Sequence, residues 1–106
     1  MSDISDRRIK PRVSCDYPAI IEGYDPDGKR YNGYARLANL SASGLYMKTH
    51  RNIENGAELT VLILLAGSII ESDAPKITTN GTVVRTEPQH DGSCGVAIQF
   101  KHYRFL

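Results

Sequence analysis

The sequence predicts an all-β fold, a small antiparallel six-stranded β-barrel with little or no C-terminal helix. Turn-forming sequences recur at short intervals, as DPDG at 25–28, NG at 55–56 and DG at 91–92, with weaker bends at 43–44 and 80–81. Glycine and asparagine accept positive φ angles, and proline presets a turn. Short segments between regular turns, without a long amphipathic helical pattern, are typical of an antiparallel barrel or sandwich. A chain of 106 residues would then hold about six strands.

Four segments between the turns have the composition of strands. Apolar residues alternate with other residues at 13–21 and again at 94–100, so each of these segments should bury one face. Residues 59–65 form a nearly continuous apolar run, which predicts a strand covered on both faces. β-Branched side chains favour a further strand at 82–84. The six residues after Phe100 are too few for a stable helix.

Composition and charge place the chain among soluble globular proteins of one domain. Apolar residues make up 41% and charged residues 24%, which excludes a disordered or fibrous protein. The net charge is only +1, so the chain lacks the global positive field of proteins that bind nucleic acid without specificity. A local group of cations near the N-terminus favours a compact anionic ligand instead. Its members are Arg7, Arg8, Lys10 and Arg12.

The polar, cationic composition before Val13 cannot bury enough apolar surface to order itself. We therefore expect residues 1–12 to form a flexible N-terminal segment and residues 13–106 to form the barrel domain. Cys15 and Cys94 match no metal motif and fall in predicted strands, where reduced thiols pack as small apolar side chains.

The chain also carries no targeting or membrane-spanning pattern. Its first residues have no apolar run of the kind found in a secretion signal. The most apolar stretch, at 59–66, is far shorter than the ~20 residues of a membrane-spanning helix. These features predict a cytoplasmic protein without membrane insertion.

The first candidate binding motif is RIKPR at 8–12, an RxxxR sequence with Arg7 directly before it. Pro11 disfavours helical geometry in the residue that precedes it, so the segment should be extended. Arg8 and Arg12 would then point to the same side, with a reach of roughly 13 Å between them. A guanidinium can pair with a phosphate, stack on a base, or meet N7 and O6 of guanine in a bidentate fork.

The second candidate motif is NLSASG at 39–44, an NxSxxG sequence between two strand-like segments. Asn39 offers an amide and Ser41 a hydroxyl, and both groups donate and accept hydrogen bonds. Two positions apart, they should share one face of a strand. Gly44 permits a sharp bend or the close approach of a ligand. Taken singly, the two motifs also fit a solvated tail and a turn.

Together, in this order and about thirty residues apart, the two motifs resemble the signature of the PilZ domain family, whose members bind the bacterial second messenger cyclic di-GMP. The resemblance runs from Arg7 to Phe100 and implies a β-barrel. It implies that the arginines bind the dinucleotide, that Asn39 and Ser41 contact a guanine, and that Gly44 keeps the pocket open. Asparagine stands where the family often has aspartate. The implied binding residues are Arg7, Arg8, Arg12, Asn39, Ser41 and Gly44.

The resemblance further implies a receptor or adaptor without catalytic activity, with cyclic di-GMP as regulatory ligand and no metal. The ligand would order the arginine segment onto the barrel and so alter a surface for a downstream protein. His50, His90 and His102 lack metal-ligand spacing, and no catalytic motif is present. Nucleic-acid binding is not expected. The downstream partner, the number of bound dinucleotides and homodimer formation stay open.

Two alternative functions remain at this point. A PilZ-like adaptor could work through protein contacts alone, without nucleotide. An oligonucleotide-binding barrel of the OB type could stack bases on Tyr24, Tyr31 and Tyr34, although few basic residues are interleaved with them. Arg85 could add a contact from the barrel wall, but an exposed strand arginine needs no ligand, so it is left out of the predicted site.

Overall fold

The computed structural model describes residues 13–14, 16–65 and 75–106, and within these ranges the chain forms strands and turns without a helix. Every strand pairing is antiparallel. The strands are β1 (Val13–Ser14), β2 (Pro18–Tyr24), β3 (Arg30–Leu40), β4 (Gly44–Thr49), β5 (Glu58–Leu64), β6 (Lys76–Pro88) and β7 (Cys94–Phe105).

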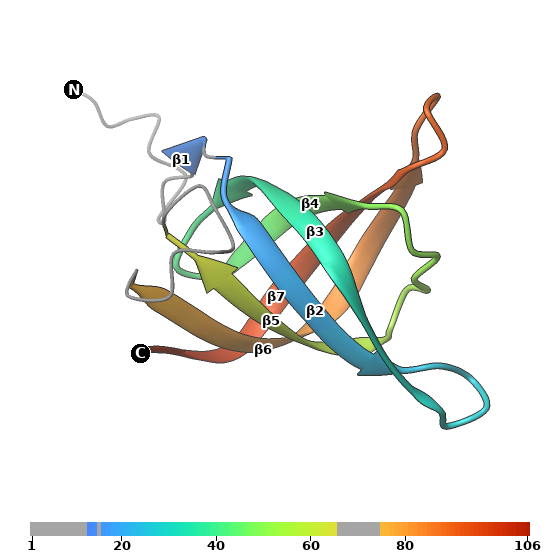
Figure 1. Cartoon of the computed structure of the whole chain (residues 1–106), viewed down its shortest axis with the longest axis horizontal. Helices are drawn as coiled ribbons and strands as arrows, with labels where there is room; N and C mark the ends of the chain where they lie inside the picture. Colours follow the sequence, from blue (N-terminus) through green and yellow to red (C-terminus); the bar gives the residue numbers. More distant parts are fainter. Residues whose placement is uncertain (1–12, 15, 66–74) are drawn as a thin grey trace.

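Six of these strands close into the predicted barrel (Figure 1). The neighbours follow the order β3, β2, β5, β6, β7, β4, and β4 returns to pair with β3. β2 occupies one side of β3 only as far as Arg36. The two-residue strand β1 then pairs with the same strand at Asn39 and Leu40. The prediction of an antiparallel six-stranded β-barrel is therefore confirmed.

The core fills the inside of the barrel with side chains from all six strands. Alternation predicted inward positions in β7 correctly, because Val96 and Ile98 are buried while Gln99 is exposed. The first predicted strand likewise buries Ala19 and Ile21. The most completely buried apolar side chains are Ala19, Ile21, Leu37, Met47, Val61, Ile63, Val83 and Val96.

β5 differs from its prediction in one respect. The apolar run does form a strand, but only one of its faces is fully buried, at Leu59, Val61 and Ile63. Thr60 and Leu62 alternate with them and are partly exposed. On that second face Leu64, at the end of the strand, is also buried, but it lies outside the core cluster. The prediction of cover on both faces was therefore wrong for most of the strand, because β5 belongs to the wall of a barrel and one of its sides faces the core.

The three strongest turn predictions are confirmed by backbone geometry. Gly28, Gly56 and Gly92 have φ angles of 82°, 88° and 88°, in the left-handed region that favours glycine. The weaker prediction at 80–81 was wrong: these residues lie inside β6, where the register with β7 shifts by one residue. This irregularity is a β-bulge rather than a turn.

The connections divide between the two ends of the barrel (Figure 1). The β2–β3 and β6–β7 hairpins and the β4–β5 loop lie at the right of the view. β1, the short β3–β4 connection at 41–43 and the C-terminus lie at the left. The strand that follows the arginine motif, β1, therefore lies at the same end of the barrel as the NxSxxG motif.

The described residues contain neither a membrane-spanning helix nor a cluster of metal-binding side chains. The described part of the chain contains no helix with the length and apolarity needed to cross a bilayer. Within the same residues, no group of three or more His, Cys, Asp or Glu side chains could hold a metal ion. Cys94 is a partly buried free thiol that packs against the core, whereas Cys15 lies outside the described residues.

The barrel core should tolerate truncation poorly. We expect Val61→Ala to lower the free energy of unfolding by roughly 2–3 kcal/mol, since it removes two buried methyl groups and leaves a cavity. Val84→Ala is the matched control, because Val84 is 51% exposed and should cost clearly less. Urea denaturation followed by circular dichroism measures both. Equal losses for the two variants would contradict this account of the core.

Candidate functional site

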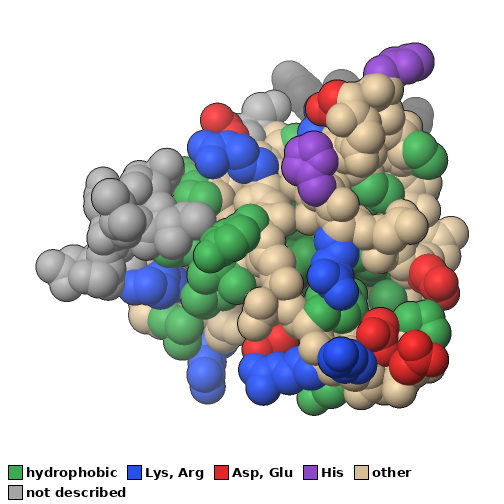
Figure 2. Space-filling model, turned by 45° about the vertical axis from the view of Figure 1, so that its right-hand side comes forward, with side chains coloured by type: hydrophobic (Ala, Val, Ile, Leu, Met, Phe, Trp, Pro, Cys, Tyr) green, Lys and Arg blue, Asp and Glu red, His purple; other side chains and the backbone are tan. Residues whose placement is uncertain are grey.

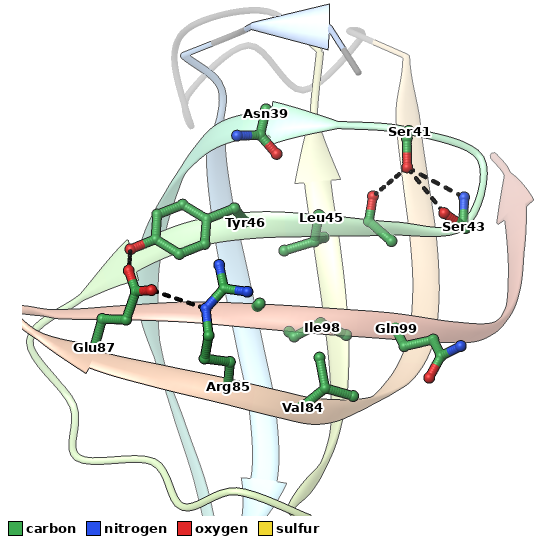
Figure 3. Close-up of a pocket in the computed structure, with 12 residues that line it drawn as sticks. Asn39, Ser41, Ser43, Leu45, Tyr46, Val84, Arg85, Glu87, Ile98 and Gln99 are labelled. Atoms are coloured by element: carbon green, nitrogen blue, oxygen red, sulfur yellow. Dashed lines mark hydrogen bonds and ion pairs between the residues drawn. The ribbon is translucent and has the colours of Figure 1, made fainter. Parts of the chain in front are cut away.

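A hollow of about 490 Å³ lies on the side of the barrel where β3, β4, β7 and β6 run next to one another (Figure 3). Its volume falls in the range of small-molecule sites. The described residues that line it are Asn39, Ser41, Ser43, Gly44, Leu45, Tyr46, Val84, Arg85, Glu87, Ala97, Ile98 and Gln99.

Three of the predicted site residues, Asn39, Ser41 and Gly44, lie together in this hollow. Arg7, Arg8 and Arg12, which the sequence also predicts as binding residues, lie outside the described residues. The hollow therefore contains the whole NxSxxG part of the predicted site.

One row of outward-facing residues crosses the hollow from β3 to β6. Asn39 pairs with Tyr46, Tyr46 with Ala97, and Ala97 with Arg85. Cross-strand partners lie on the same face of a sheet. Three strand spacings put Asn39 and Arg85 roughly 14 Å apart along this row.

Two β-bulges turn the ends of this row outward. In β3, Leu37 pairs with Met47 and Asn39 pairs with Tyr46, so Ala38 is an extra residue. In β6, Val83 and Arg85 pair with consecutive residues of β7. Strict alternation would place Asn39 on the same face as the buried Leu37. Because of the extra residue, Asn39 instead lies on the face opposite to Leu37. The bulge in β6 places Arg85 on the outer face in the same way.

Ser41 lies just past the end of β3 and bonds mainly within its own turn. Its Oγ lies 3.2 Å from Ser43 Oγ and donates to the carbonyl of Gly44 at 3.3 Å (Figure 3). The backbone amide of Ser43 donates to Ser41 Oγ at 3.3 Å. These are the local bonds that a serine in a turn is expected to make. They fix the hydroxyl at the rim of the hollow, where it can still accept or donate to a ligand.

Gly44 is required by the packing of the barrel itself. A Cβ at this position would lie 2.2 Å from the carbonyl oxygen of Ile98 in β7. Glycine therefore allows β4 to approach β7 and complete the ladder that begins with the Gly44–Gln99 pair. This role exists without any ligand and adds to the one implied by the sequence.

Arg85, Glu87 and Tyr46 form a connected group in which Tyr46 lies on the strand next to Asn39 and the other two lie on β6 (Figure 3). Arg85 Nε donates to Glu87 Oε2 at 2.8 Å, and Tyr46 Oη donates to Glu87 Oε1 at 2.8 Å. The guanidinium carbon of Arg85 lies 5.9 Å from the centre of the Tyr46 ring. Both carboxylate oxygens are thus occupied, one by each neighbour.

Electrostatics follow from these bonds. The hydrogen bond from Tyr46, with help from Arg85, lowers the pKa of Glu87. The same bond to Glu87, with some desolvation, raises the pKa of Tyr46. Glu87 therefore stays a carboxylate and Tyr46 a neutral phenol over the physiological pH range.

Small residues of β7 make room for this group. A Cβ on Gly95 would lie 1.8 Å from Tyr46 Oη, so only glycine lets the tyrosine cross β7 towards Glu87. Ala97 is the cross-strand partner of both Tyr46 and Arg85. A larger side chain there would occupy the space between them.

Sequence reasoning left out Arg85 and did not identify Tyr46 or Glu87. A signal for Tyr46 exists, since it lies between the apolar Leu45 and Met47 and must face outward in a strand. No such signal exists for Arg85, because its direction depends on a bulge and Tyr46, the ring beside it, comes from a strand distant in sequence.

The attachment point of the arginine motif is next to the NxSxxG motif. Val13 pairs with Leu40 and Ser14 with Asn39. Ser14 thus extends the row of paired residues by one further strand, beyond Asn39. The chain that bears the arginines joins the barrel at the rim of the hollow.

Charge on the described surface is dispersed. Figure 2 shows basic and acidic side chains in small separate groups on one face of the molecule, without a continuous patch of either sign among the described residues. Several of these side chains form exposed ion pairs, such as Arg36 with Asp16 and Lys101 with Glu58. In the hollow, Arg85 and Glu87 are the charged residues of the described lining, and they neutralise each other.

Comparison with known proteins identifies the family. The PilZ domain family matches residues 6–104. The chain belongs to the PilZ domain family. This confirms the resemblance carried by the two motifs and excludes the alternative of an OB-type barrel. No functionally curated protein sequence matches the chain.

Solved structures share the fold of this PilZ domain. The inhibitor of motility MotI/DgrA from Bacillus subtilis superposes with a TM-score of 0.69 and 18% identity over 93% of this chain and 44% of that one. The PilZ domain of YcgR from Escherichia coli, solved with c-di-GMP, gives 0.59 and 13% over 92% and 79%. The MrkH–c-di-GMP complex from K. pneumonia gives 0.62 and 20% over 92% and 45%. The chain thus spans less than half the length of MotI and MrkH.

Gly44 gives a testable consequence of the barrel packing. We expect Gly44→Ala to lower the free energy of unfolding by roughly 1–3 kcal/mol even without ligand, because the added methyl group meets a backbone carbonyl. Gly33→Ala in β3 is the matched control, since a Cβ there has no neighbour closer than 3.8 Å. Thermal or urea unfolding measures both. A Gly44→Ala variant as stable as the control would contradict this packing role of the glycine.

Proposed function

We propose that this PilZ domain is a cyclic di-GMP receptor. Its N-terminal arginine segment is ordered onto the barrel when the dinucleotide binds, and the altered surface is recognised by a partner protein. The observation that carries the proposal is the register of β1, which attaches the arginine-bearing segment beside Asn39 at the rim of the hollow.

Chain connectivity brings Arg12 within reach of the hollow. One peptide bond of 3.8 Å between Cα atoms joins Arg12 to Val13, and Val13 pairs with Leu40. An antiparallel pair is about 5 Å across, so the chain that leads back to the arginines leaves the barrel directly beside Leu40. Arg8 is four residues further along, within roughly 13 Å of Arg12 when extended.

The charge balance of the hollow supports a role for this segment. The described wall supplies one guanidinium, already paired with a carboxylate. Cyclic di-GMP carries two phosphodiester charges, so most of the attraction must come from elsewhere. The cations at 7–12 are the nearest source in the sequence, and a segment that closes over the ligand would neutralise both phosphates.

The NxSxxG part of the site supplies hydrogen bonds to a base. Asn39 faces the hollow with an amide for which the structure gives no hydrogen bond among the described residues (Figure 3). An amide with free donor and acceptor can pair with the edge of guanine. Ser41 adds a hydroxyl on the same rim. Because position 39 is asparagine and not aspartate, the site has one negative charge fewer next to a dianionic ligand.

Calorimetric titration with cyclic di-GMP tests the receptor function. We expect a dissociation constant near the micromolar range, about −8 kcal/mol. Arg8→Ala and Arg12→Ala should each weaken binding about ten- to hundredfold, since each removes charge-assisted hydrogen bonds of about 1.5–3 kcal/mol. Asn39→Ala should weaken it about tenfold.

Arg30→Ala is the matched control for charge. Arg30 begins β3 at the opposite end of the barrel and pairs with Glu22 there. Its removal should leave affinity unchanged within a factor of two. A titration of the parent protein that releases no heat, with no change in thermal stability on adding ligand, would instead favour an adaptor that works without nucleotide.

Limited proteolysis tests the ordering of the arginine segment. Trypsin cuts after arginine in flexible chain, so we expect cyclic di-GMP to slow cleavage after Arg7, Arg8 and Arg12 severalfold. Cleavage in the β2–β3 hairpin, after Lys29 and Arg30, serves as the internal control and should keep its rate. If the dinucleotide binds but slows cleavage neither in the arginine segment nor in the hairpin, the arginine segment is not ordered by the ligand.

A further inference from the structure

The carboxylate of Glu87 is an unexpected neighbour for the site proposed above. It lies in the lining of a hollow that, under the proposed function, receives a ligand with two negative charges. By charge alone, Glu87 should repel that ligand. A carboxylate in this position needs a compensating role.

The contacts of Glu87 indicate that role. One oxygen accepts from Arg85 Nε and the other from Tyr46 Oη, each at 2.8 Å. A guanidinium has five N–H donors in a fixed planar fork. Only the one on Nε is used here, and the structure gives the terminal nitrogens no hydrogen bond among the described residues. Holding Nε therefore fixes the plane of the group and leaves its terminal N–H groups for a ligand.

The direction of Arg85 agrees with such a role. From β6 its side chain extends across β7 towards β4, with the guanidinium beside the Tyr46 ring in the hollow (Figure 3). The side chain is 57% exposed, so without a partner it would sample several rotamers. The bulge at Val84 turns it outward, and Glu87 then limits where it points.

Tyr46 anchors Glu87 in turn. Glu87 is itself 46% exposed and would be a weak restraint on its own. Tyr46 belongs to β4 and reaches Glu87 by crossing β7 over Gly95. The restraint on Arg85 is thereby tied to a second strand on the far side of β7.

We propose that Arg85 is a ligand-contacting residue of the hollow and that Glu87 and Tyr46 are positioning residues that hold its guanidinium with the terminal N–H groups towards the ligand. The inference rests on the proposed function, because the ligand is the anionic dinucleotide. It adds three residues of the barrel wall to a site that the sequence motifs place at 7–12 and 39–44. An oriented fork can meet a pair of acceptor atoms, whereas an unrestrained one first loses rotamer entropy.

The decisive experiment is calorimetric titration of Glu87→Ala with cyclic di-GMP. Simple electrostatics predicts tighter binding, since a negative charge beside a dianion has been removed. The positioning role predicts the opposite, a loss of affinity of about five- to twentyfold. Affinity that is unchanged or improved in Glu87→Ala overturns the proposal, provided that the parent protein binds.

Three further variants complete the test. Arg85→Lys keeps the charge but lacks the fork and the Nε–H, so it should lose affinity by a factor similar to that of Glu87→Ala. Tyr46→Phe keeps the ring but frees Glu87, and should lose about threefold. Glu58→Ala is the matched carboxylate control, because Glu58 also forms an exposed ion pair, with Lys101, but does not line the hollow. Parent-like affinity in Arg85→Lys would mean that charge alone suffices, and would also overturn the proposal.

A spectroscopic measurement separates this inference from the proposed function. Ultraviolet titration of the phenols, with Tyr46→Phe subtracted, reports the pKa of Tyr46. That pKa should fall towards its ordinary value in Glu87→Ala, since the acceptor that stabilises the neutral phenol has gone. An unchanged value would show that the two side chains do not interact in solution. If the parent binds no dinucleotide, the proposed function fails, and with it the ligand contact, whatever the titration gives.

Discussion

The barrel and its hollow depend on the close approach of β4 to β7 at Gly44. The carbonyl oxygen of Ile98 occupies the space that any side chain at this position would need. Because β4 also pairs with β3, this contact closes the barrel and joins β3 to the β6–β7 side. The row from Asn39 through Tyr46 and Ala97 to Arg85 exists only when that closure is made. The absence of a Cβ at Gly44 is thus required for both the fold and the candidate site.

Local signals in the sequence account for most of the fold. The turns at Gly28, Gly56 and Gly92 were predictable because a left-handed residue followed by a new strand leaves a strong trace in composition. Alternation in β7 was predictable because one face of the strand is buried. The cover of β5 was not, since an apolar run is compatible with one or two buried faces. Composition alone does not distinguish a barrel wall from an inner strand.

The site was only half predictable, for a reason that lies in the register. The NxSxxG residues are neighbours in sequence, so a motif can show them. Tyr46 meets Arg85 and Glu87 across β7, although these residues lie 39 and 41 positions away from it in the sequence, so their proximity depends on the pairing of β4 and β6 with β7. Family membership confirms the resemblance that the motifs carry. It does not by itself indicate which wall residues face the hollow.

The extra residue at Val84 also bears on how such a wall could change during evolution. The inserted position is unpaired, and the pairs on either side of it are consecutive in β7, Val83 with Ile98 and Arg85 with Ala97. A single codon lost there would let the same pairs form a regular ladder, so Arg85 would keep its outward face. The strand would lose the local kink and extra twist that a bulge brings. Related barrels with the same strand pairs could therefore differ in the shape of this wall while keeping the residues that it presents.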